Sequence, residues 1–263
     1  MADPTVPILD MRAVGKTYRA NGRTTEALRE ANLTVSRGEF VCLLGASGCG
    51  KSTLLRVAAG FEAPTSGQAL MWGKPIPGPG PSRGMVFQDY GLFPWLTVRD
   101  NIGFGPKSRK RPAAEVRDIA ERYISLVGLQ AFADAYPHQL SGGMKQRVAI
   151  ARVLANEAEV VLMDEPFGAL DAMTRERLQD ELLELWSRTG LTILFVTHAI
   201  EEAIFLADRI VMMSPGPGRI ETVHEVDLPR RRDVSSPAFN DLRRMLAAQL
   251  HSHHAPRTAT VAA

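Results

Sequence analysis

The sequence predicts an α/β fold with a mainly parallel sheet, an antiparallel β portion and a helical subdomain. Short apolar runs suited to buried strands alternate with stretches in which apolar residues recur at helical spacing, and this order favours a right-handed parallel sheet. The chain has 263 residues, of which 45% are hydrophobic. It can therefore build a sizeable core, as one large domain or as two modest ones.

Strands are predicted where apolar and polar residues alternate, or where apolar residues form short runs. Residues 8–18 and 31–35 alternate around a polar loop at Asn21 and Gly22, which indicates an antiparallel pair. Later strands are expected at residues 39–44, 68–72, 84–88, 160–163, 191–197 and 209–213, with one or two weak strands after Gly218. The proline-rich and glycine-rich residues 73–83 predict a surface loop.

Helices are predicted where apolar residues fall three and four positions apart. They cover residues 51–59, 112–127, 142–156, 172–188, 200–206 and about 238–250. Gly60 and Gly128 are expected to end the first two helices, and Ser141 to cap the third. The chain between Gln88 and Ser141 is expected to form a helical subdomain on the core. Trp186 is expected to pack into the core from a long amphipathic helix.

The charge balance argues against a nucleic-acid partner. The net charge is +2, from 31 basic and 29 acidic residues, so no broad basic surface is expected. Two short basic runs, residues 107–111 and 230–232, contain no interleaved aromatic side chains. We interpret both as solvated loop charge.

The cysteines and the apolar runs point to a cytoplasmic protein. Cys42 lies in an apolar run and Cys49 in a glycine-rich loop, so a disulfide framework is not expected. The first residues lack the basic and apolar regions of a secretory leader, and no run approaches the roughly 20 apolar residues that span a bilayer. We expect the chain to be neither secreted nor membrane-spanning by itself.

A phosphate-binding loop lies between a predicted buried strand and a predicted helix, the context of a P-loop NTPase core. Its glycines let successive N–H groups surround phosphate oxygens, Lys51 adds a cation, and the Ser52 hydroxyl can ligate Mg²⁺. The predicted nucleotide contacts are Gly45, Ala46, Ser47, Gly48, Cys49, Gly50, Lys51, Ser52 and Thr53.

Acidic and histidine side chains follow two later strands. Asp164 ends an apolar run, where its carboxylate can hold Mg²⁺, and Glu165 is the candidate to position and polarise an attacking water. His198 follows the strand at 191–197 and would reach the γ-phosphate as a donor. The alternatives are an acidic pair at a strand end and a histidine with a structural role.

A second anion-contacting turn lies at Leu140-Ser141-Gly142-Gly143-Met144. Glycines after a serine at a helix start let backbone N–H groups approach an anion. Since the chain already has one phosphate loop, this turn suggests a site that a partner completes.

These motifs, with Gln88 and the segment Ala169-Leu170-Asp171, occur in the order found in ATPase subunits of ABC transporters, which residues 8–215 resemble. The resemblance implies that Tyr18 stacks on adenine, although a packed strand aromatic is the alternative. It also implies that Gln88 senses Mg²⁺ and the γ-phosphate, that Asp171 belongs to the D-loop and that His198 is the switch histidine. ATP and Mg²⁺ are the implied cofactors. The implied catalytic residues are Lys51, Gln88, Glu165 and His198, and the implied metal ligands are Ser52, Gln88 and Asp164.

The same resemblance implies a domain organisation and partners. Residues 1–220 would form the ATPase domain, with a helical subdomain at about 89–156. Residues 221–263 would form an extension and a flexible tail with His251, His253 and His254. Two copies would pair head to tail, so that Ser141 to Gly143 of one copy close the ATP site of the other. They would serve membrane permease subunits, and indirectly a solute-binding protein, on the cytoplasmic face of a bacterial inner membrane.

Three features are similar to the import branch for nitrate, sulfonates and taurine: Met144, residues 93–97 and residues 215–219. Within residues 93–97, Phe93, Trp95 and Leu96 would form a docking groove if exposed and ordinary core if buried.

The alternative functions are an ABC importer ATPase for an unrelated small solute, a non-transport ABC ATPase acting on DNA or the ribosome, and a P-loop kinase. The chain lacks the long coiled coil and the tandem ATPase domains of the non-transport types, and a kinase would have no use for Ser141 to Gly143.

Overall fold

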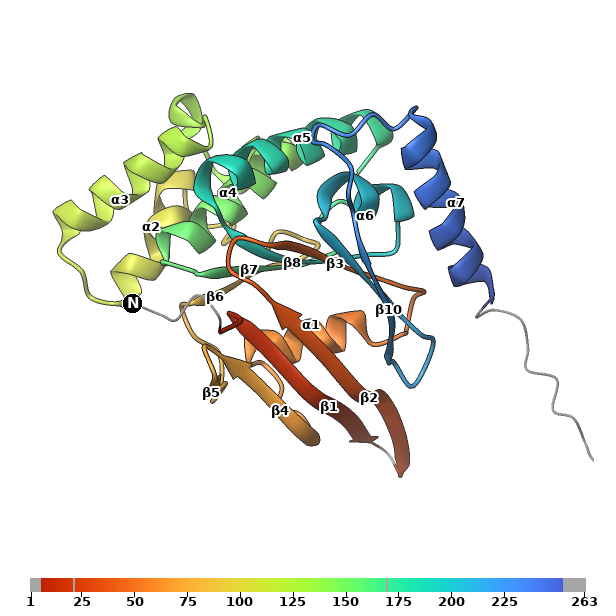
Figure 1. Cartoon of the computed structure of the whole chain (residues 1–263). Coiled ribbons are helices and arrows are strands. Elements are labelled where there is room, and N and C mark those ends of the chain that lie inside the picture. The colour runs from red at the N-terminus through yellow and green to blue at the C-terminus, as the bar shows by residue number, and fades with distance from the viewer. Residues whose placement is uncertain (1–5, 21, 169, 253–263) are drawn as a thin grey trace, which may run out of the picture.

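The computed structural model describes residues 6–20, 22–168 and 170–252. Asn21, Ala169, His253 and His254, which the expectations above include, lie outside the described residues. The described chain contains two sheets, which are separated in space by helix α1, Lys51–Ala59 (Figure 1).

The larger sheet has six strands in the order β10-β9-β3-β8-β7-β6. In that order the strands are Ile220–Glu225, Arg209–Met213, Phe40–Leu44, Thr192–Thr197, Val160–Asp164 and Arg83–Val86. All neighbouring pairs are parallel except β10 with β9. The predicted α/β class with a mainly parallel sheet is confirmed.

The smaller sheet is antiparallel and has the order β2-β1-β4-β5. Its strands are β1 Leu9–Ala20, β2 Arg23–Val35, β4 Ser66–Met71 and β5 Lys74–Pro75. The antiparallel pair predicted at the start of the chain is confirmed, but β2 begins earlier than residue 31. The predicted loop at 73–83 contains β5, which is only two residues long and therefore gives little alternation in the sequence.

Strand alternation divides the interior into two apolar layers. In β3, Phe40 and Cys42 face one layer while Val41 and Leu43 face the other. The first layer is covered by α4 Gly142–Ala155, α5 Ala172–Thr189, α6 Ile200–Leu206 and α7 Pro237–Ser252, and the second by α1 and the antiparallel sheet. Because both faces are covered, the central strands consist of nearly continuous apolar residues.

The helical subdomain lies at one end of the sheet, around α2 Val98–Ser108, α3 Ala113–Leu126 and α4 (Figure 1). The sequence did not predict α2 as a separate helix, because Gly103, Gly105 and Pro106 interrupt its pattern. Its start is nevertheless marked locally, since the Thr97 side chain caps the helix by accepting from the Asp100 N–H. No helix within the described ranges is long and apolar enough to cross a membrane.

The C-terminal segments join the same core. Strand β10 extends the larger sheet, and Phe239 and Leu246 of α7 are buried in the layer that α6 also covers. Helix α7 continues to Ser252, so His251 lies on this helix rather than in a tail. Trp186 of α5 packs edge-on against Phe40 at a centroid distance of 6.1 Å, and its Nε1 donates to the Gly38 carbonyl. The expected core role of Trp186 is thus confirmed.

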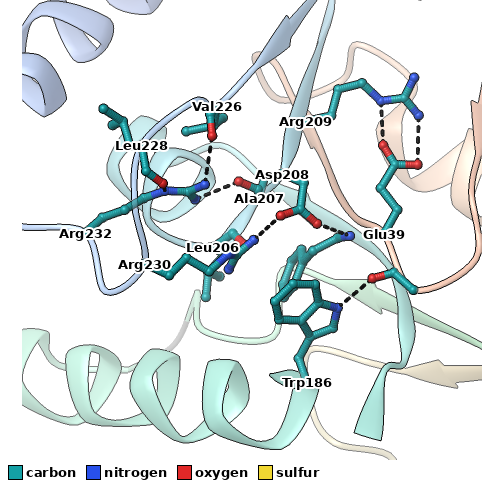
Figure 2. A network of polar contacts seen from close by, with 12 residues as sticks. Glu39, Trp186, Leu206, Ala207, Asp208, Arg209, Val226, Leu228, Arg230 and Arg232 are labelled. Atoms are coloured by element: carbon teal, nitrogen blue, oxygen red, sulfur yellow. Dashed lines mark hydrogen bonds and ion pairs between the residues drawn. The ribbon is translucent and has the colours of Figure 1, made fainter. Parts of the chain in front are cut away.

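The interpretation of residues 230–232 as solvated charge is wrong for two of the three arginines (Figure 2). The buried Arg232 donates to the carbonyls of Ile204 and Ala207 at 2.7 and 2.6 Å, and also to those of Phe205, Val226 and Leu228. Arg230 donates to Asp208 and to the Leu206 carbonyl, and its guanidinium lies 4.3 Å from the Trp186 ring centroid. The last carbonyls of a helix have no partner within the helix, and these arginines supply one for α6.

Two arginines of the other basic run, residues 107–111, are also paired. Arg109 and Arg111 both form ion pairs with Glu157, which follows α4. These side chains remain partly exposed. The run therefore links the end of α2 to the end of α4.

Candidate active site

The candidate site lies at the carboxyl edge of the parallel sheet. The loop at residues 45–50 follows β3, Gln88 follows β6, Asp164 and Glu165 lie at the end of β7, and His198 follows β8. Because β3, β6, β7 and β8 run parallel, their carboxyl ends meet at one edge, where ligands of open α/β sheets bind. The topology thus brings together the residues that the sequence analysis selected at four separate strand ends.

The phosphate loop depends on glycines at positions with left-handed backbone. Gly48 has φ +79° and Gly50 has φ +93°, values that other residues rarely adopt. The buried Lys51 reaches back over the loop, and its Nζ donates to the carbonyls of Gly45 and Ala46 at 2.7 and 2.9 Å. The loop and the first turn of α1 thus form one compact, cationic structure.

Gly218 supports the phosphate loop, a role that the sequence pattern did not predict. Its N–H donates to the Ala27 carbonyl at 3.0 Å, and its own carbonyl accepts from the Arg29 N–H. A Cβ at this position would lie 2.0 Å from the Cys49 carbonyl oxygen, so only glycine fits. The sequence signal is the run Pro215-Gly-Pro-Gly-Arg219, which resembles the import branch but does not by itself indicate contact with the phosphate loop.

Both cysteines are free and buried, in agreement with the absence of a predicted disulfide. Cys49 lies inside the phosphate loop, with its Sγ 3.8 Å from Lys51 Nζ. Burial raises the pKa of the Cys49 thiol, while the neighbouring Lys51 ammonium partly opposes the shift. The thiol is therefore a poor nucleophile at neutral pH.

Two oxygen groups suited to a divalent cation lie together beside the loop. Ser52 Oγ on α1 donates to Asp164 Oδ1 at 2.8 Å. A hydroxyl and a carboxylate are donors that Mg²⁺ accepts, and Mg²⁺ commonly takes only one or two protein ligands beside phosphate and water. Among the residues in the described ranges, no cluster of three or more His, Cys, Asp or Glu side chains could hold a metal ion. The pair Ser52 and Asp164 fits a shared magnesium site of this sparse kind.

Glu165 and His198 form a second pair at the same edge. Glu165 Oε2 lies 3.0 Å from His198 Nδ1, and both side chains are partly accessible to solvent. Glu165 has φ +46°, an uncommon backbone conformation for a residue with a side chain. Its N–H donates to the Val196 carbonyl at 3.0 Å, which holds this turn against β8.

Gln88 lies close to this pair. A Cβ added at Gly168 would be 3.5 Å from Gln88 Nε2 and 3.8 Å from Glu165 Oε2, so both side chains border the same glycine. The Gln88 side chain is exposed to solvent and is not part of the buried core.

Tyr18 reaches α1 from β1. Its hydroxyl donates to Glu62, and the Thr53 side chain is a further hydrogen-bond partner. Lys16 Nζ lies 5.2 Å from the Tyr18 ring centroid. Burial and the hydrogen bond to Glu62 raise the pKa of the Tyr18 hydroxyl. The ring is half-buried next to the phosphate-loop helix, which is compatible with the adenine-stacking role and with a packed strand aromatic.

The turn at residues 140–144 caps α4 as predicted. Ser141 Oγ accepts from the Met144 N–H at 3.3 Å, and Ser141 is exposed. The atoms closest to Cβ positions built on Gly142 and Gly143 belong to Tyr90, Leu170, Arg177 and Leu178. None of these residues belongs to the phosphate loop. Within one chain, therefore, the turn at 140–144 does not contact the phosphate loop through Gly142 or Gly143.

Asp171 caps the next helix, α5. Its Oδ1 accepts from the Thr174 N–H at 3.0 Å, and this hydrogen bond lowers the pKa of its carboxyl. The side chain is exposed. Asp171 therefore lies at the surface beside Leu170, whose side chain approaches Gly142.

The chain belongs to the ABC transporter family, which residues 28–168 match. An uncharacterized ABC transporter ATP-binding protein of Methanocaldococcus jannaschii is 50% identical over 238 residues, which cover 90% of this chain and 89% of that protein. The fold and the site thus define an ATP-binding subunit that hydrolyses ATP.

Two relatives have names that state a cargo. The nitrate import ATP-binding protein NrtD of Synechococcus elongatus is 49% identical over 89% of this chain and 88% of its own. The taurine import ATP-binding protein TauB of Pelagibacter ubique is 49% identical over 79% of this chain and 78% of its own.

Solved structures have the same fold. A dimeric ATP-binding cassette in a post-hydrolysis state, bound to ADP and Pi, superimposes with a TM-score of 0.70 at 33% identity, covering 83% of this chain and 98% of that one. A subunit of a Clostridium perfringens ABC transporter complex superimposes with a TM-score of 0.76 at 30% identity, covering 94% of this chain and 98% of that one.

Proposed function

We propose that two copies of this chain bind two MgATP between them and that hydrolysis drives a membrane permease which imports a small oxyanion. The observation that carries the catalytic part is the convergence of two polar pairs, Ser52 with Asp164 and Glu165 with His198, beside Lys51 at one sheet edge. Each pair has a separate task in phosphoryl transfer to water.

The phosphate loop would hold the nucleotide. Its N–H groups and the Lys51 ammonium stabilise negative charge on the β- and γ-phosphates, as does the N-terminus of α1. Tyr18 lies beside Thr53 at the same helix, where its ring would stack on the adenine.

Glu165 would position and polarise the attacking water, and His198 would hold the γ-phosphate. Transfer to water needs an in-line nucleophile and donors that stabilise the equatorial oxygens. The 3.0 Å contact between Glu165 and His198 keeps the carboxylate oriented. Gln88, near Glu165, would respond to the γ-phosphate and the cation.

Ser52 and Asp164 would hold Mg²⁺, with Gln88 as a further ligand. A divalent cation supplies charge neutralisation at the phosphates when it is bound. Ser52→Ala and Asp164→Asn should each raise the Mg²⁺ concentration needed for half-maximal hydrolysis, by about tenfold if one of few ligands is lost. Hydrolysis that needs no divalent cation would contradict the assignment.

The second copy would complete the site. The exposed Ser141 and the start of α4 present N–H groups and partial positive charge, which can cover a γ-phosphate that the phosphate loop leaves open. A head-to-tail pair with two-fold symmetry forms two such sites at once. The cassette with ADP and Pi, to which this chain is similar, is dimeric, which supports the pairing of two copies.

A groove between α2 and α3, lined by both apolar and charged side chains, would receive a segment of the permease. Trp95 is 71% exposed and Phe104 is 42% exposed, and with Leu96 they line a groove of about 500 Å³. Phe93 packs on Phe104 at a centroid distance of 4.5 Å and fixes its ring. The sequence left two alternatives for Phe93, Trp95 and Leu96, a docking groove and ordinary core. The exposure of Trp95 supports the docking groove. The permease then places the chain at the cytoplasmic face of the bacterial inner membrane.

The cargo would be nitrate, taurine or an aliphatic sulfonate, delivered by a solute-binding protein. The names of the nitrate and taurine import relatives, both 49% identical to this chain, support this proposal. The test is ATP hydrolysis by the chain reconstituted with its permease, measured against a panel of binding proteins loaded with each solute. Stimulation by an oxyanion-loaded binding protein is expected. Stimulation only by an unrelated solute would overturn the cargo and leave the ATPase assignment intact.

A further inference from the structure

The buried carboxylate of Glu202 contacts the turn that carries His198, and no step of the proposed reaction uses it. Glu202 on α6 is 7% exposed, and its Oε2 accepts from the Thr197 hydroxyl at 2.6 Å. The same hydroxyl accepts from the Ala199 N–H at 3.0 Å. Thr197 and Ala199 flank His198, so this pair of hydrogen bonds closes the turn that carries the histidine.

The second oxygen of Glu202 faces a different segment. Glu202 Oε1 lies 3.5 Å from Arg175 Nε, a buried atom without a hydrogen-bond partner. Through Nη2, Arg175 donates to the Leu170 carbonyl at 2.8 Å. Leu170 immediately precedes Asp171, the exposed residue that caps α5. Arg175 thus connects the buried carboxylate to the segment that ends at Asp171.

The energetics favour a positional role for this carboxylate over a stabilising one. Burial raises the pKa of Glu202, while the Thr197 hydroxyl and the charge of Arg175 lower it. A buried carboxylate contributes little net stability even when it is paired, because desolvation offsets the attraction. Its directional contacts, by contrast, fix the orientation of the groups that it touches.

We propose that Glu202 is a positioning residue that couples the turn carrying His198 to the segment before Asp171, through Thr197 on one side and Arg175 on the other. This inference depends on the proposed function, in which His198 faces the γ-phosphate and the second copy pairs at Ser141, next to Gly142, which the Leu170 side chain approaches. A shift of the Leu170–Arg175 backbone on pairing then changes the position of Glu202, and with it the orientation of His198. Hydrolysis becomes sensitive to the presence of the partner.

Single and double substitutions in the full chain test the coupling. Glu202→Gln keeps an acceptor for Thr197 but removes the charge that faces Arg175, and Arg175→Gln removes the opposite charge. Each should lower kcat about tenfold or more while nucleotide Kd stays within about twofold, because misplacement affects the reaction more than binding. The double variant should be no slower than either single variant, since both break the same link.

A second pair of substitutions tests the side nearer to His198. Thr197→Ser keeps the hydroxyl and should retain most of kcat, whereas Thr197→Val should lose about as much as Glu202→Gln. Glu201→Gln is the matched control, because Glu201 is the adjacent residue on α6 and points outward, with its side chain 65% exposed. It should hydrolyse ATP at the wild-type rate.

The outcomes separate this proposal from the proposed function. If His198→Ala abolishes hydrolysis while Glu202→Gln and Arg175→Gln both keep the wild-type kcat, the coupling is wrong and the function stands. Independent, multiplying effects of the two substitutions would also overturn it. If Glu202→Gln does not fold, Arg175→Gln and the Thr197 pair decide the result, since the Arg175 side chain is 36% exposed and its replacement should leave the fold intact. If the wild-type chain does not hydrolyse ATP, the proposed function itself fails.

Discussion

Glu165 and His198 meet at 3.0 Å although 33 positions separate them in the sequence, because β7 and β8 are adjacent parallel strands that end at the same edge. The contact joins a carboxylate and an imidazole that are both accessible to solvent. This relationship defines the reactive part of the site. Because each of the two residues is anchored by its own strand, either one can be substituted without displacing the backbone of the other.

Replacing His198 with Ala should lower the rate of ATP hydrolysis by about 100-fold, in the range typical for the loss of one positioned polar group. Nucleotide affinity should change less than about threefold, because Lys51 and the phosphate loop remain intact. The measurement is phosphate release at saturating MgATP together with nucleotide binding by fluorescence. His251→Ala, at an exposed position on α7, is the control and should have no effect. Full activity of His198→Ala would remove the histidine from the site.

Replacing Gly218 with Ala should weaken nucleotide binding about tenfold or more. The added Cβ would approach the Cys49 carbonyl oxygen to 2.0 Å, so the phosphate loop must move. Gly216→Ala is the matched control, because a Cβ there meets no atom within 4 Å. Titration of each variant with a fluorescent ATP analogue measures the effect. Equal affinities of the two variants would show that the segment does not support the loop.

Alkylation of Cys49 should be slow at neutral pH and should accelerate as the pH rises. Burial raises the thiol pKa, so the reactive thiolate forms at more alkaline pH than for a free cysteine. MgATP should slow the reaction further, since Cys49 lies within the phosphate loop. Iodoacetamide labelling of a Cys42→Ala variant, followed by mass spectrometry, measures both effects. Rapid labelling at pH 7 without protection by MgATP would contradict the buried loop geometry.

Replacing Arg232 with Met should lower the free energy of unfolding by about 3 kcal/mol, since buried carbonyls at the end of α6 lose their donor. Burial lowers the pKa of Arg232 to about 10, so the guanidinium is still charged at neutral pH and can donate to all five carbonyls. Urea denaturation gives the difference. The neighbouring Arg231→Met, at an exposed position, should change stability by less than about 0.5 kcal/mol. Similar stabilities for both variants would contradict the structural role.

Much of the site could be predicted from the sequence because its residues lie directly after strands. Runs such as 160–163 specify buried parallel strands, and parallel strands place Asp164 and His198 at one edge. The pattern of glycines before Lys51 is likewise local, since it reflects backbone angles within the loop itself.

Other features depend on distant segments and gave no local signal. Arg232 is buried only because the chain returns to the end of α6, so its neighbours in the sequence suggested solvated charge. Gly218 supports the phosphate loop through contacts with residues 27–29 and with residue 49. All of these residues lie about 170 positions or more before it in the sequence. The sequence pattern does not predict helix α2, because its glycines and proline have low helix propensity. Tertiary packing tolerates these residues in the helix.

The association state of Glu165→Gln with MgATP tests the central claim most directly, namely that two copies of this chain share two ATP sites. Without the carboxylate that activates water, turnover should stop and ATP should remain between the phosphate loop of one copy and Ser141 of the other. Sedimentation velocity should then detect a dimer that forms only with MgATP and that Ser141→Arg abolishes. A Glu165→Gln variant that binds MgATP stoichiometrically but stays monomeric, or that still hydrolyses ATP at the wild-type rate, would contradict the account.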